Sequence, residues 1–175
     1  MSNPRMTETS YIVLGLLELA EQATPYDLKR FAQLSVFNFW SVPHTQIYTE
    51  CKRLAEAGLL DERREEGGRR RRFYRLTPSG QKAMDEWRDE PTNQLSEIRD
   101  LGLLKLFFGA DPPKLASTQA EAHREKLEEF EQSESEVPEM PPGMRLALDL
   151  GIAHERVFMR FWSQIAAGEA SDESN

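Results

Sequence analysis

Hydrophobic and polar positions in the first part of the chain follow the spacing of short helices. Residues 9–20 are apolar on almost every side of a helical projection, which predicts a short helix that is buried on most of its surface. After the polar break EQA, a second helix is predicted from Pro25 to about Leu34. Thr24 can cap this helix, and proline suits the first helical position.

A third helix is predicted from Pro43 or His44 to Gly58, because glycine fits the left-handed conformation that ends many helices. One face is apolar and should pack inward, and it consists of Ile47, Cys51, Leu54 and Ala55. The opposite face carries groups that donate or accept hydrogen bonds, namely His44, Thr45, Tyr48, Thr49 and Lys52. Such groups have little reason to cluster unless they meet solvent or a partner. This face is therefore a candidate reading surface.

Two short strands are predicted next, over Leu59–Arg64 and Arg70–Leu76, and the pair Gly67-Gly68 between them is a strong hairpin signal. A fourth helix follows in the segment TPSGQKAMDEW, which begins with the same combination of cap and proline as the second helix. The order helix, helix, helix, hairpin, helix is typical of a winged helix-turn-helix. We assign this DNA-binding domain to residues 1–90.

Beyond residue 90 the pattern predicts helices over about Leu95–Phe108, Pro113–Ser133 and Pro142–Ala167. The middle helix has a short coiled-coil-like seam, and the last one presents more apolar surface than a lone helix can leave in water. We therefore expect residues 91–167 to form an α-helical dimerisation region, with the homodimer contacts within residues 95–167. The acidic tail, 168–175, should be disordered. The predicted fold class is mainly α with a small two-stranded β wing.

Charge is distributed unevenly along the chain. The formal net charge is −8, which by itself argues against nucleic acid as a partner. Residues 1–90, however, contain 14 Lys and Arg against 14 Asp and Glu, whereas the remainder contains 8 against 16. Within residues 41–75 there are 9 basic and 6 acidic residues. An acidic protein with one basic patch of this kind can still bind phosphates.

Other classes of function find no support in the residue pattern. No segment approaches the roughly 18 apolar residues of a membrane span, and the start of the chain is unlike a signal peptide, so we expect a cytoplasmic, nucleoid-associated protein. The histidines His44, His123 and His154 are too dispersed for a metal site. Because a nucleophile elbow and a phosphate-binding glycine loop are also missing, we expect no metal, no cofactor and no catalysis. Cys51 is interpreted as an inert buried thiol in preference to a redox sensor.

The third helix and the hairpin together suit double-stranded DNA. The major groove admits one α-helix, and the residues near the N-terminus of that helix point at base edges. Lys52 and Arg53, further along, can reach backbone phosphates. The hairpin adds a run of arginines, of which about half can meet DNA at once, because alternate residues of a strand face opposite sides. We favour Arg69 and Arg70, which lie nearest the tip.

Three motifs resemble the PadR-like regulators, in matching order over about residues 10–87: SYIVLGLLELAEQATPYDLKRF, FWSVPHTQIYTECKRLAEAGLLDER and GGRRRRFYRLTPSGQKAMDEW. In that family an aromatic pair, here Phe39 and Trp40, precedes the recognition helix. The resemblance implies DNA contacts at Tyr48 and its neighbours, with one departure at Thr49, where many relatives have proline. The DNA-binding residues expected from pattern and resemblance together are His44, Thr45, Gln46, Tyr48, Thr49, Lys52, Arg53, Arg69, Arg70 and Arg71.

The predicted function is sequence-specific DNA binding in transcription regulation, by a homodimer on a near-palindromic operator with its two third helices about 34 Å apart. The resemblance implies a repressor, often one that a small aromatic ligand releases. The residues themselves identify neither operator nor effector. The alternative is a helical dimeriser whose winged domain binds protein, because winged folds host several functions and the net charge is unfavourable for DNA.

Overall fold

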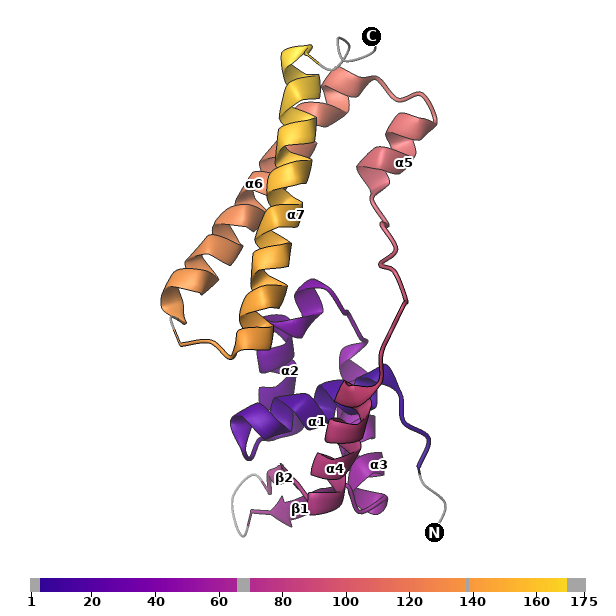
Figure 1. Cartoon of the computed structure of the whole chain (residues 1–175), viewed down its shortest axis with the longest axis vertical. Helices are drawn as coiled ribbons and strands as arrows, with labels where there is room; N and C mark the ends of the chain where they lie inside the picture. Colours follow the sequence, from indigo (N-terminus) through magenta and orange to yellow (C-terminus); the bar gives the residue numbers. More distant parts are fainter. Residues whose placement is uncertain (1–3, 66–69, 138, 170–175) are drawn as a thin grey trace. The chain divides into compact units, whose positions relative to one another are not determined.

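The computed structural model describes residues 4–65, 70–137 and 139–169 (Figure 1). The chain divides into two compact units, Met1–Gln94 and Leu95–Asn175. Both are built mainly from helices, and the first adds a two-stranded antiparallel sheet, which confirms the predicted fold class. Among the described residues, no helix combines the length and the apolar character that crossing a bilayer requires.

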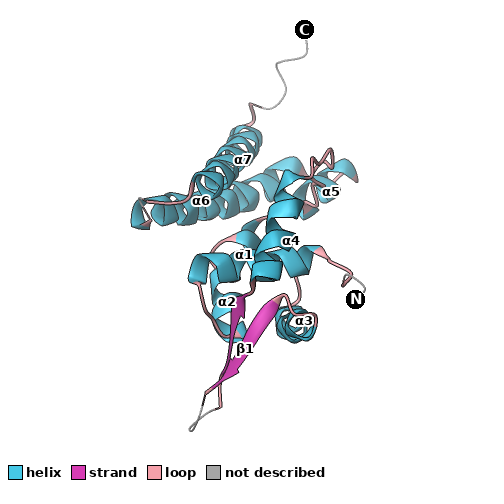
Figure 2. Ribbon diagram, turned by 60° about the horizontal axis from the view of Figure 1, so that its bottom comes forward, coloured by secondary structure: helices cyan, strands magenta, loops and turns pink. Residues whose placement is uncertain are grey.

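The N-terminal unit has the predicted order of helix, helix, helix, hairpin, helix (Figure 2). Its elements are α1 Glu8–Ala20, α2 Pro25–Gln33, the 3-10 turn η1 Val36–Asn38, α3 His44–Glu56, β1 Leu60–Arg64, β2 Arg72–Leu76 and α4 Pro78–Asp89. Three of the helices begin at a threonine whose hydroxyl accepts from a backbone N–H three residues later: Thr7, Thr24 and Thr77. α3 differs, because Pro43 stands at its cap and offers no side-chain acceptor.

α1 is the central element of the core of this unit. Its Val13, Leu14 and Leu17 side chains are completely buried, and the helix packs against α2, α3, α4 and β2. From α3, Ile47 and Leu54 join the same cluster. Burying one such side chain contributes about 1.5–3 kcal/mol, so this cluster fixes α3 firmly against α1. The prediction that the first helix is a core element is confirmed.

β1 and β2 form the hairpin, and at its base Leu60 lies opposite Leu76. Ala23, just before α2, joins the edge of this sheet through two backbone hydrogen bonds with Tyr74, of 3.1 and 2.9 Å. The hairpin is thereby attached to the helix-turn-helix at a defined place.

The second strand is shorter than predicted, because β2 begins at Arg72 and not at Arg70. Arg70 has a φ of 45°, in the left-handed region, and a residue in that conformation cannot continue an extended strand. The predicted Gly67-Gly68 turn lies outside the described residues.

The C-terminal unit contains α5 Leu101–Phe107, α6 Pro112–Glu136 and α7 Pro142–Ala167. α6 and α7 lie side by side as an antiparallel pair (Figure 1). The seam predicted for α6, which consists of Ala116, Ala120, His123, Leu127 and Phe130, is confirmed as its packed face, since His123 is partly buried and the other four are buried. Of the predicted acidic tail, residues 170–175 lie outside the described part of the chain.

The prediction of a helix from about Leu95 is wrong for its first six residues, because α5 begins only at Leu101. The Asp100 side chain caps α5 by accepting from a backbone N–H at 2.9 Å. Before this cap, Leu95 and Ile98 are 88% and 64% exposed. A short helix depends on the packing of its apolar face, and these side chains supply little of it.

Candidate DNA-binding surface

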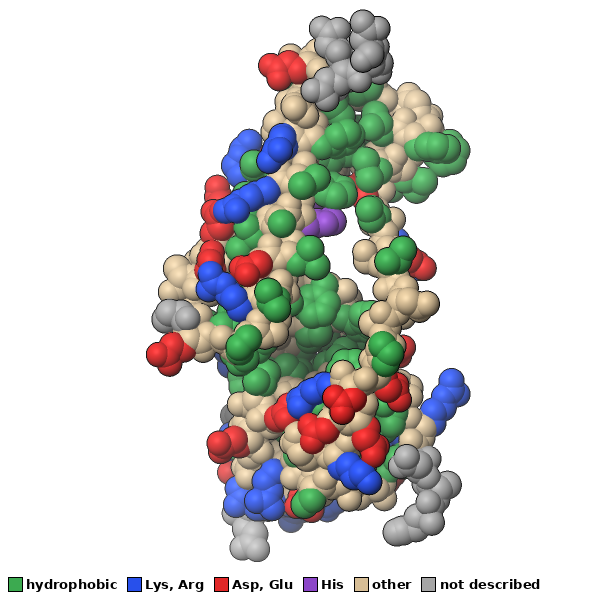
Figure 3. All heavy atoms as spheres, in the orientation of Figure 1, with side chains coloured by type: hydrophobic (Ala, Val, Ile, Leu, Met, Phe, Trp, Pro, Cys, Tyr) green, Lys and Arg blue, Asp and Glu red, His purple; other side chains and the backbone are tan. Residues whose placement is uncertain are grey.

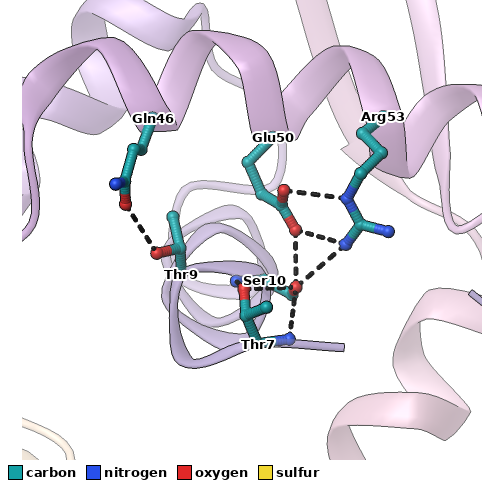
Figure 4. A network of polar contacts seen from close by, with 6 residues as sticks. All are labelled: Thr7, Thr9, Ser10, Gln46, Glu50 and Arg53. Atoms are coloured by element: carbon teal, nitrogen blue, oxygen red, sulfur yellow. Dashed lines mark hydrogen bonds and ion pairs between the residues drawn. The ribbon is translucent and has the colours of Figure 1, made fainter. Parts of the chain in front are cut away.

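The residues of α3 fall into three parallel stripes, because side chains three and four positions apart share one face of a helix. The inner stripe is buried in the core and consists of Ile47, Cys51 and Leu54. The middle stripe faces the start of α1 and consists of Gln46, Glu50 and Arg53 (Figure 4). The outer stripe is exposed and consists of Thr45, Thr49 and Lys52. The predicted site residues on α3 thus belong to more than one face.

The outer stripe combines two hydroxyl groups with one ammonium group. The Thr49 hydroxyl donates to the backbone carbonyl of Thr45 at 3.1 Å and keeps its acceptor capacity toward solvent. Lys52 forms an ion pair of 3.6 Å with Glu56, and both side chains are well exposed. An exposed pair of this kind contributes at most about 1 kcal/mol, so Lys52 can exchange Glu56 for a phosphate.

His44 and Tyr48 form a neighbouring row at the first turns of α3. Tyr48 is 46% exposed, and the His44 ring centroid lies 5.9 Å from that of Phe37. The backbone N–H of Gln46 donates to the Pro43 carbonyl at 2.9 Å, and because Pro43 offers no side-chain acceptor, the N–H groups of His44 and Thr45 are left for acceptors outside the described part of the chain. The partial positive charge of a helix N-terminus therefore lies beside these two side chains.

The middle stripe makes its polar contacts with the first residues of α1 (Figure 4). The Gln46 carboxamide oxygen accepts from the Thr9 hydroxyl at 3.3 Å. The Glu50 carboxylate accepts from the Ser10 hydroxyl at 2.5 Å, and Arg53 donates to the same hydroxyl oxygen at 3.1 Å. Two predicted DNA contacts, Gln46 and Arg53, therefore have partners within the protein.

Glu50 and Arg53 form an ion pair in which only 11% of the acid and 35% of the base side chain are exposed. Burial raises the pKa of Glu50, but hydrogen bonds from Arg53 and Ser10 outweigh this effect and leave the pKa below its ordinary value. The same hydrogen bond to Glu50 raises the pKa of Arg53. Both groups are thus charged at neutral pH, and the half-buried Arg53 side chain is bound to partners within the domain.

The hairpin sorts its arginines onto two faces, because alternate residues of a strand point to opposite sides. On the face toward the core, Arg64 and Arg72 both pair with Glu62, at 2.9 and 3.6 Å. The buried Tyr74 also donates its hydroxyl to Glu62, at 2.9 Å. Arg64 and Arg72 therefore share the carboxylate of Glu62, which lies on the same face of the hairpin as both arginines.

The outward face of the hairpin carries Arg63 and Arg71 around one aromatic ring. Their guanidinium carbons lie 5.8 and 5.6 Å from the ring centroid of Phe73. Arg71 also pairs with Glu65 at 3.0 Å, and both Arg63 and Arg71 are exposed. Arg70 is exposed as well, in the loop before β2. Arg69 lies outside the described residues.

Sequence reasoning missed the residues that hold α3, above all Ser10 and Glu50. Each had a signal, since Ser10 is a hydroxyl within an apolar helix and Glu50 is an acid on a basic face, three positions before Arg53. It also missed Phe73 as the residue around which wing arginines gather. The alternation of the strand could have indicated this grouping once the register was known.

Cys51 is completely buried on the inner stripe, as predicted. Burial and the charge of Glu50 raise the pKa of its thiol to about 12, so the reactive thiolate is disfavoured. Within residues 4–65, 70–137 and 139–169, no group of three or more His, Cys, Asp or Glu side chains is arranged to hold a metal ion.

Comparison with known proteins gives a family match and one curated relative. Residues 13–86 match the model of the family described as Transcriptional regulator PadR-like family. The chain is 32% identical over 107 residues to the negative transcriptional regulator PadR of Bacillus subtilis (strain 168). This match covers 59% of the chain and 57% of the relative, so it spans little more than half of either protein.

Solved structures share the fold over most of the chain. Bacillus subtilis PadR in complex with operator DNA has a TM-score of 0.80 at 24% identity, covering 94% of this chain and 99% of that chain. A PadR-like transcriptional regulator from Bacillus cereus has a TM-score of 0.80 at 18% identity, covering 95% and 100%. Bacillus subtilis PadR in complex with p-coumaric acid has a TM-score of 0.74 at 22% identity, covering 96% and 100%. The winged fold, the recognition-helix motif and the family match over residues 13–86 agree, and in this segment the chain is similar to the PadR-like transcriptional regulators.

Proposed function

We propose that this protein is a sequence-specific DNA-binding transcriptional regulator that acts as a homodimeric repressor. The observation that carries the proposal is the exposed polar outer stripe of α3, which belongs to the same compact unit as a hairpin with outward arginines. We assign DNA binding to residues 1–90 and dimerisation to residues 91–167. The curated relative is a negative regulator, which supports repression as the direction of control.

In this proposal α3 enters the major groove with Thr45, Tyr48 and Thr49 toward base edges. Lys52 contacts a phosphate after leaving Glu56. The outward wing arginines bind the neighbouring backbone, where their contribution depends on salt. The backbone N–H groups of His44 and Thr45, at the start of α3, supply further donors for a phosphate or a base edge.

The dimer is proposed to form through apolar side chains that α7 and α5 leave exposed (Figure 3). On α7 these are Leu146, Leu150, Val157 and Phe161, and on α5 they are Leu104 and Phe107. They occur within a single unit of about 80 residues, and exposed apolar surface of this extent marks an interaction site. A near-palindromic operator follows, because a two-fold dimer presents two α3 helices about 34 Å apart.

Release by a small molecule is part of the same proposal. Bacillus subtilis PadR has been solved with p-coumaric acid, which makes a small aromatic acid the first effector class to test. The effector would act by shifting the dimer between a spacing that fits the operator and one that does not.

The test is a titration of duplex DNA carrying the promoter of the protein's own gene, with a scrambled duplex of the same length as control. We expect the promoter duplex to bind at least 10³-fold more tightly than the scrambled one, a ratio typical of specific regulators. Equal affinities, or no binding at low salt, would reject the proposal. Dimerisation is read by sedimentation, where Val157→Glu should yield monomers and the exposed change Arg160→Glu should not.

A further inference from the structure

A small set of buried polar contacts joins the start of α1 to the middle of α3 (Figure 4). Ser10 is completely buried, and its hydroxyl oxygen lies 2.5 Å from Glu50 and 3.1 Å from Arg53. Arg53 donates to both oxygens of Glu50, at 2.9 and 2.5 Å. The Ser10 hydroxyl also accepts from the backbone N–H of Thr7 at 2.8 Å. Each of the three side chains Ser10, Glu50 and Arg53 therefore contacts the other two.

Stability alone gives a weak reason for this arrangement. Removing two charges from water costs free energy that their attraction only partly returns, and apolar side chains of similar volume often serve at least as well. The neighbouring inner stripe of α3 already packs through Ile47 and Leu54. What hydrogen bonds add to apolar packing is direction, because they tolerate only a narrow range of distance and angle.

The rotation of α3 about its axis matters because each outer-stripe residue is followed directly by a middle-stripe residue in the sequence, so both stripes move together. Thr45, Thr49 and Lys52 stand next to Gln46, Glu50 and Arg53, respectively. Side-chain tips lie about 5–6 Å from a helix axis, so a rotation of α3 by about 20° moves them by about 2 Å. A displacement of this size breaks a hydrogen bond to a base edge. Fixing the rotation of α3 therefore fixes what the outer stripe can read.

We propose that Ser10, Glu50 and Arg53 are positioning residues for operator discrimination, which lock the rotation of α3 against α1 without touching DNA. This inference rests on the DNA binding proposed above. It replaces the expectation that Arg53 binds a phosphate with a different role for the same residue. Loss of the lock lets α3 turn, so contacts with bases weaken while contacts with phosphates, which long flexible side chains make, persist.

The experiment uses the full-length protein and a duplex selected from a random pool by the wild-type protein. Affinities for this duplex and for a scrambled duplex of equal length are measured at one salt concentration for Ser10→Ala, Glu50→Gln and Arg53→Lys. Thr77→Ala is the control, because it removes the cap of α4 and a hydrogen bond to the Gly58 carbonyl, beyond the end of α3, but leaves the contacts of Ser10, Glu50 and Arg53 in place. Thermal unfolding of each variant is recorded alongside.

For each of the three variants, we expect affinity for the selected duplex to fall about tenfold, with less than about threefold change for the scrambled duplex. Thr77→Ala should lower the melting temperature and leave the ratio of the two affinities at the wild-type value. Arg53→Lys is the most informative variant, because lysine serves as a phosphate contact but cannot reproduce the two-pronged bond to Glu50.

Two results overturn the inference. One is an unchanged affinity ratio in folded Ser10→Ala and Arg53→Lys, and the other is an equal loss for both duplexes, which would make Arg53 a phosphate contact. Failure of the wild-type protein to select any duplex would instead reject DNA binding itself and the inference with it. If Glu50→Gln does not fold, Ser10→Ala decides the question, because it removes one oxygen atom and leaves the ion pair in place.

Discussion

Arg53 and Glu50 form a forked ion pair across one turn of α3, with nitrogen–oxygen distances of 2.9 and 2.5 Å. The pair lies between the recognition helix and the start of α1, where Ser10 bonds to both partners (Figure 4). It ties the surface that should meet DNA to the best-packed helix of the unit. Protonating Glu50, or removing either side chain of the pair, should therefore change the stability of the N-terminal unit as well as its binding to DNA.

Glu50→Gln should destabilise the N-terminal unit by about 1–3 kcal/mol at pH 7, because hydrogen bonds to a charged group are lost. The folded-state pKa of Glu50 lies below its ordinary value, so its contribution is complete above the unfolded pKa of about 4.3 and is lost as pH falls through the folded pKa. Denaturant titrations should therefore show the wild-type advantage shrinking below about pH 4.3. Glu56→Gln, on the exposed side of the same helix, should change stability by less than about 0.5 kcal/mol.

Gly80→Ala should destabilise the N-terminal unit by about 1–3 kcal/mol or prevent its folding. A Cβ at this position would lie 2.2 Å from the backbone oxygen of Leu59, so α4 and the residue that precedes β1 would have to separate. The control is Gly143→Ala in the first turn of α7, where a Cβ meets no atom within 4 Å among the described residues. Thermal unfolding of both variants tests this prediction. An unchanged melting temperature in Gly80→Ala would contradict the close approach of Gly80 to Leu59.

Cys51 should resist thiol reagents in the native protein. Its folded-state pKa of about 12 lies above the value of about 8.5 in an unfolded chain, so the folded thiol stays protonated as pH rises to 10. The stability that this shift contributes is complete below about pH 8.5 and is lost between there and about pH 12. Labelling should become rapid only in denaturant. Fast labelling at pH 8 without denaturant would show that the thiol is accessible.

Arg71→Ala should weaken binding to all DNA sequences alike and reduce the salt slope by about one phosphate contact. Arg71 lies on the outward face of the wing, over Phe73. Arg64→Ala is the matched control, because Arg64 faces the other side of the strand and pairs with Glu62. Affinities at several salt concentrations separate the two. Equal effects of both variants would show that strand alternation does not select the DNA-binding arginines.

Tyr48→Ala should change which sequences are preferred, by about 1–3 kcal/mol at one or two base pairs, and should leave non-specific binding almost intact. Tyr48 is 46% exposed at the edge of the outer stripe. Tyr26→Ala on α2 removes a similarly exposed ring from a helix without that stripe and serves as the control. Sequence selection from a random pool gives the preference of each variant. An unaltered preference in Tyr48→Ala would remove Tyr48 from the reading surface.

Local signals predicted most of the elements, because each acts over a few residues. Thr24 with Pro25 marked the start of α2, and the same signal at Thr77 and Pro78 marked α4. Helical spacing placed the start of α5 near Leu95, although Asp100 carries a cap signal and α5 begins at Leu101. Helical spacing indicates which side chains would share one face of a helix, but it does not show whether another element packs against that face.

The sequence by itself determined the order of the elements, the packed face of α3 and the basic hairpin, since periodicity and caps depend on residues that lie close together in the sequence. Only the tertiary structure decided what Arg53 contacts, because Glu50 and Ser10 lie 3 and 43 positions away in the sequence, and Ser10 meets Arg53 only when α1 packs on α3. It likewise decided which wing arginines share Glu62 and which surround Phe73, because strand register sets the side that each residue faces. Contacts between segments that are far apart in the sequence form only when the hydrophobic core packs, and no local sequence pattern specifies that packing.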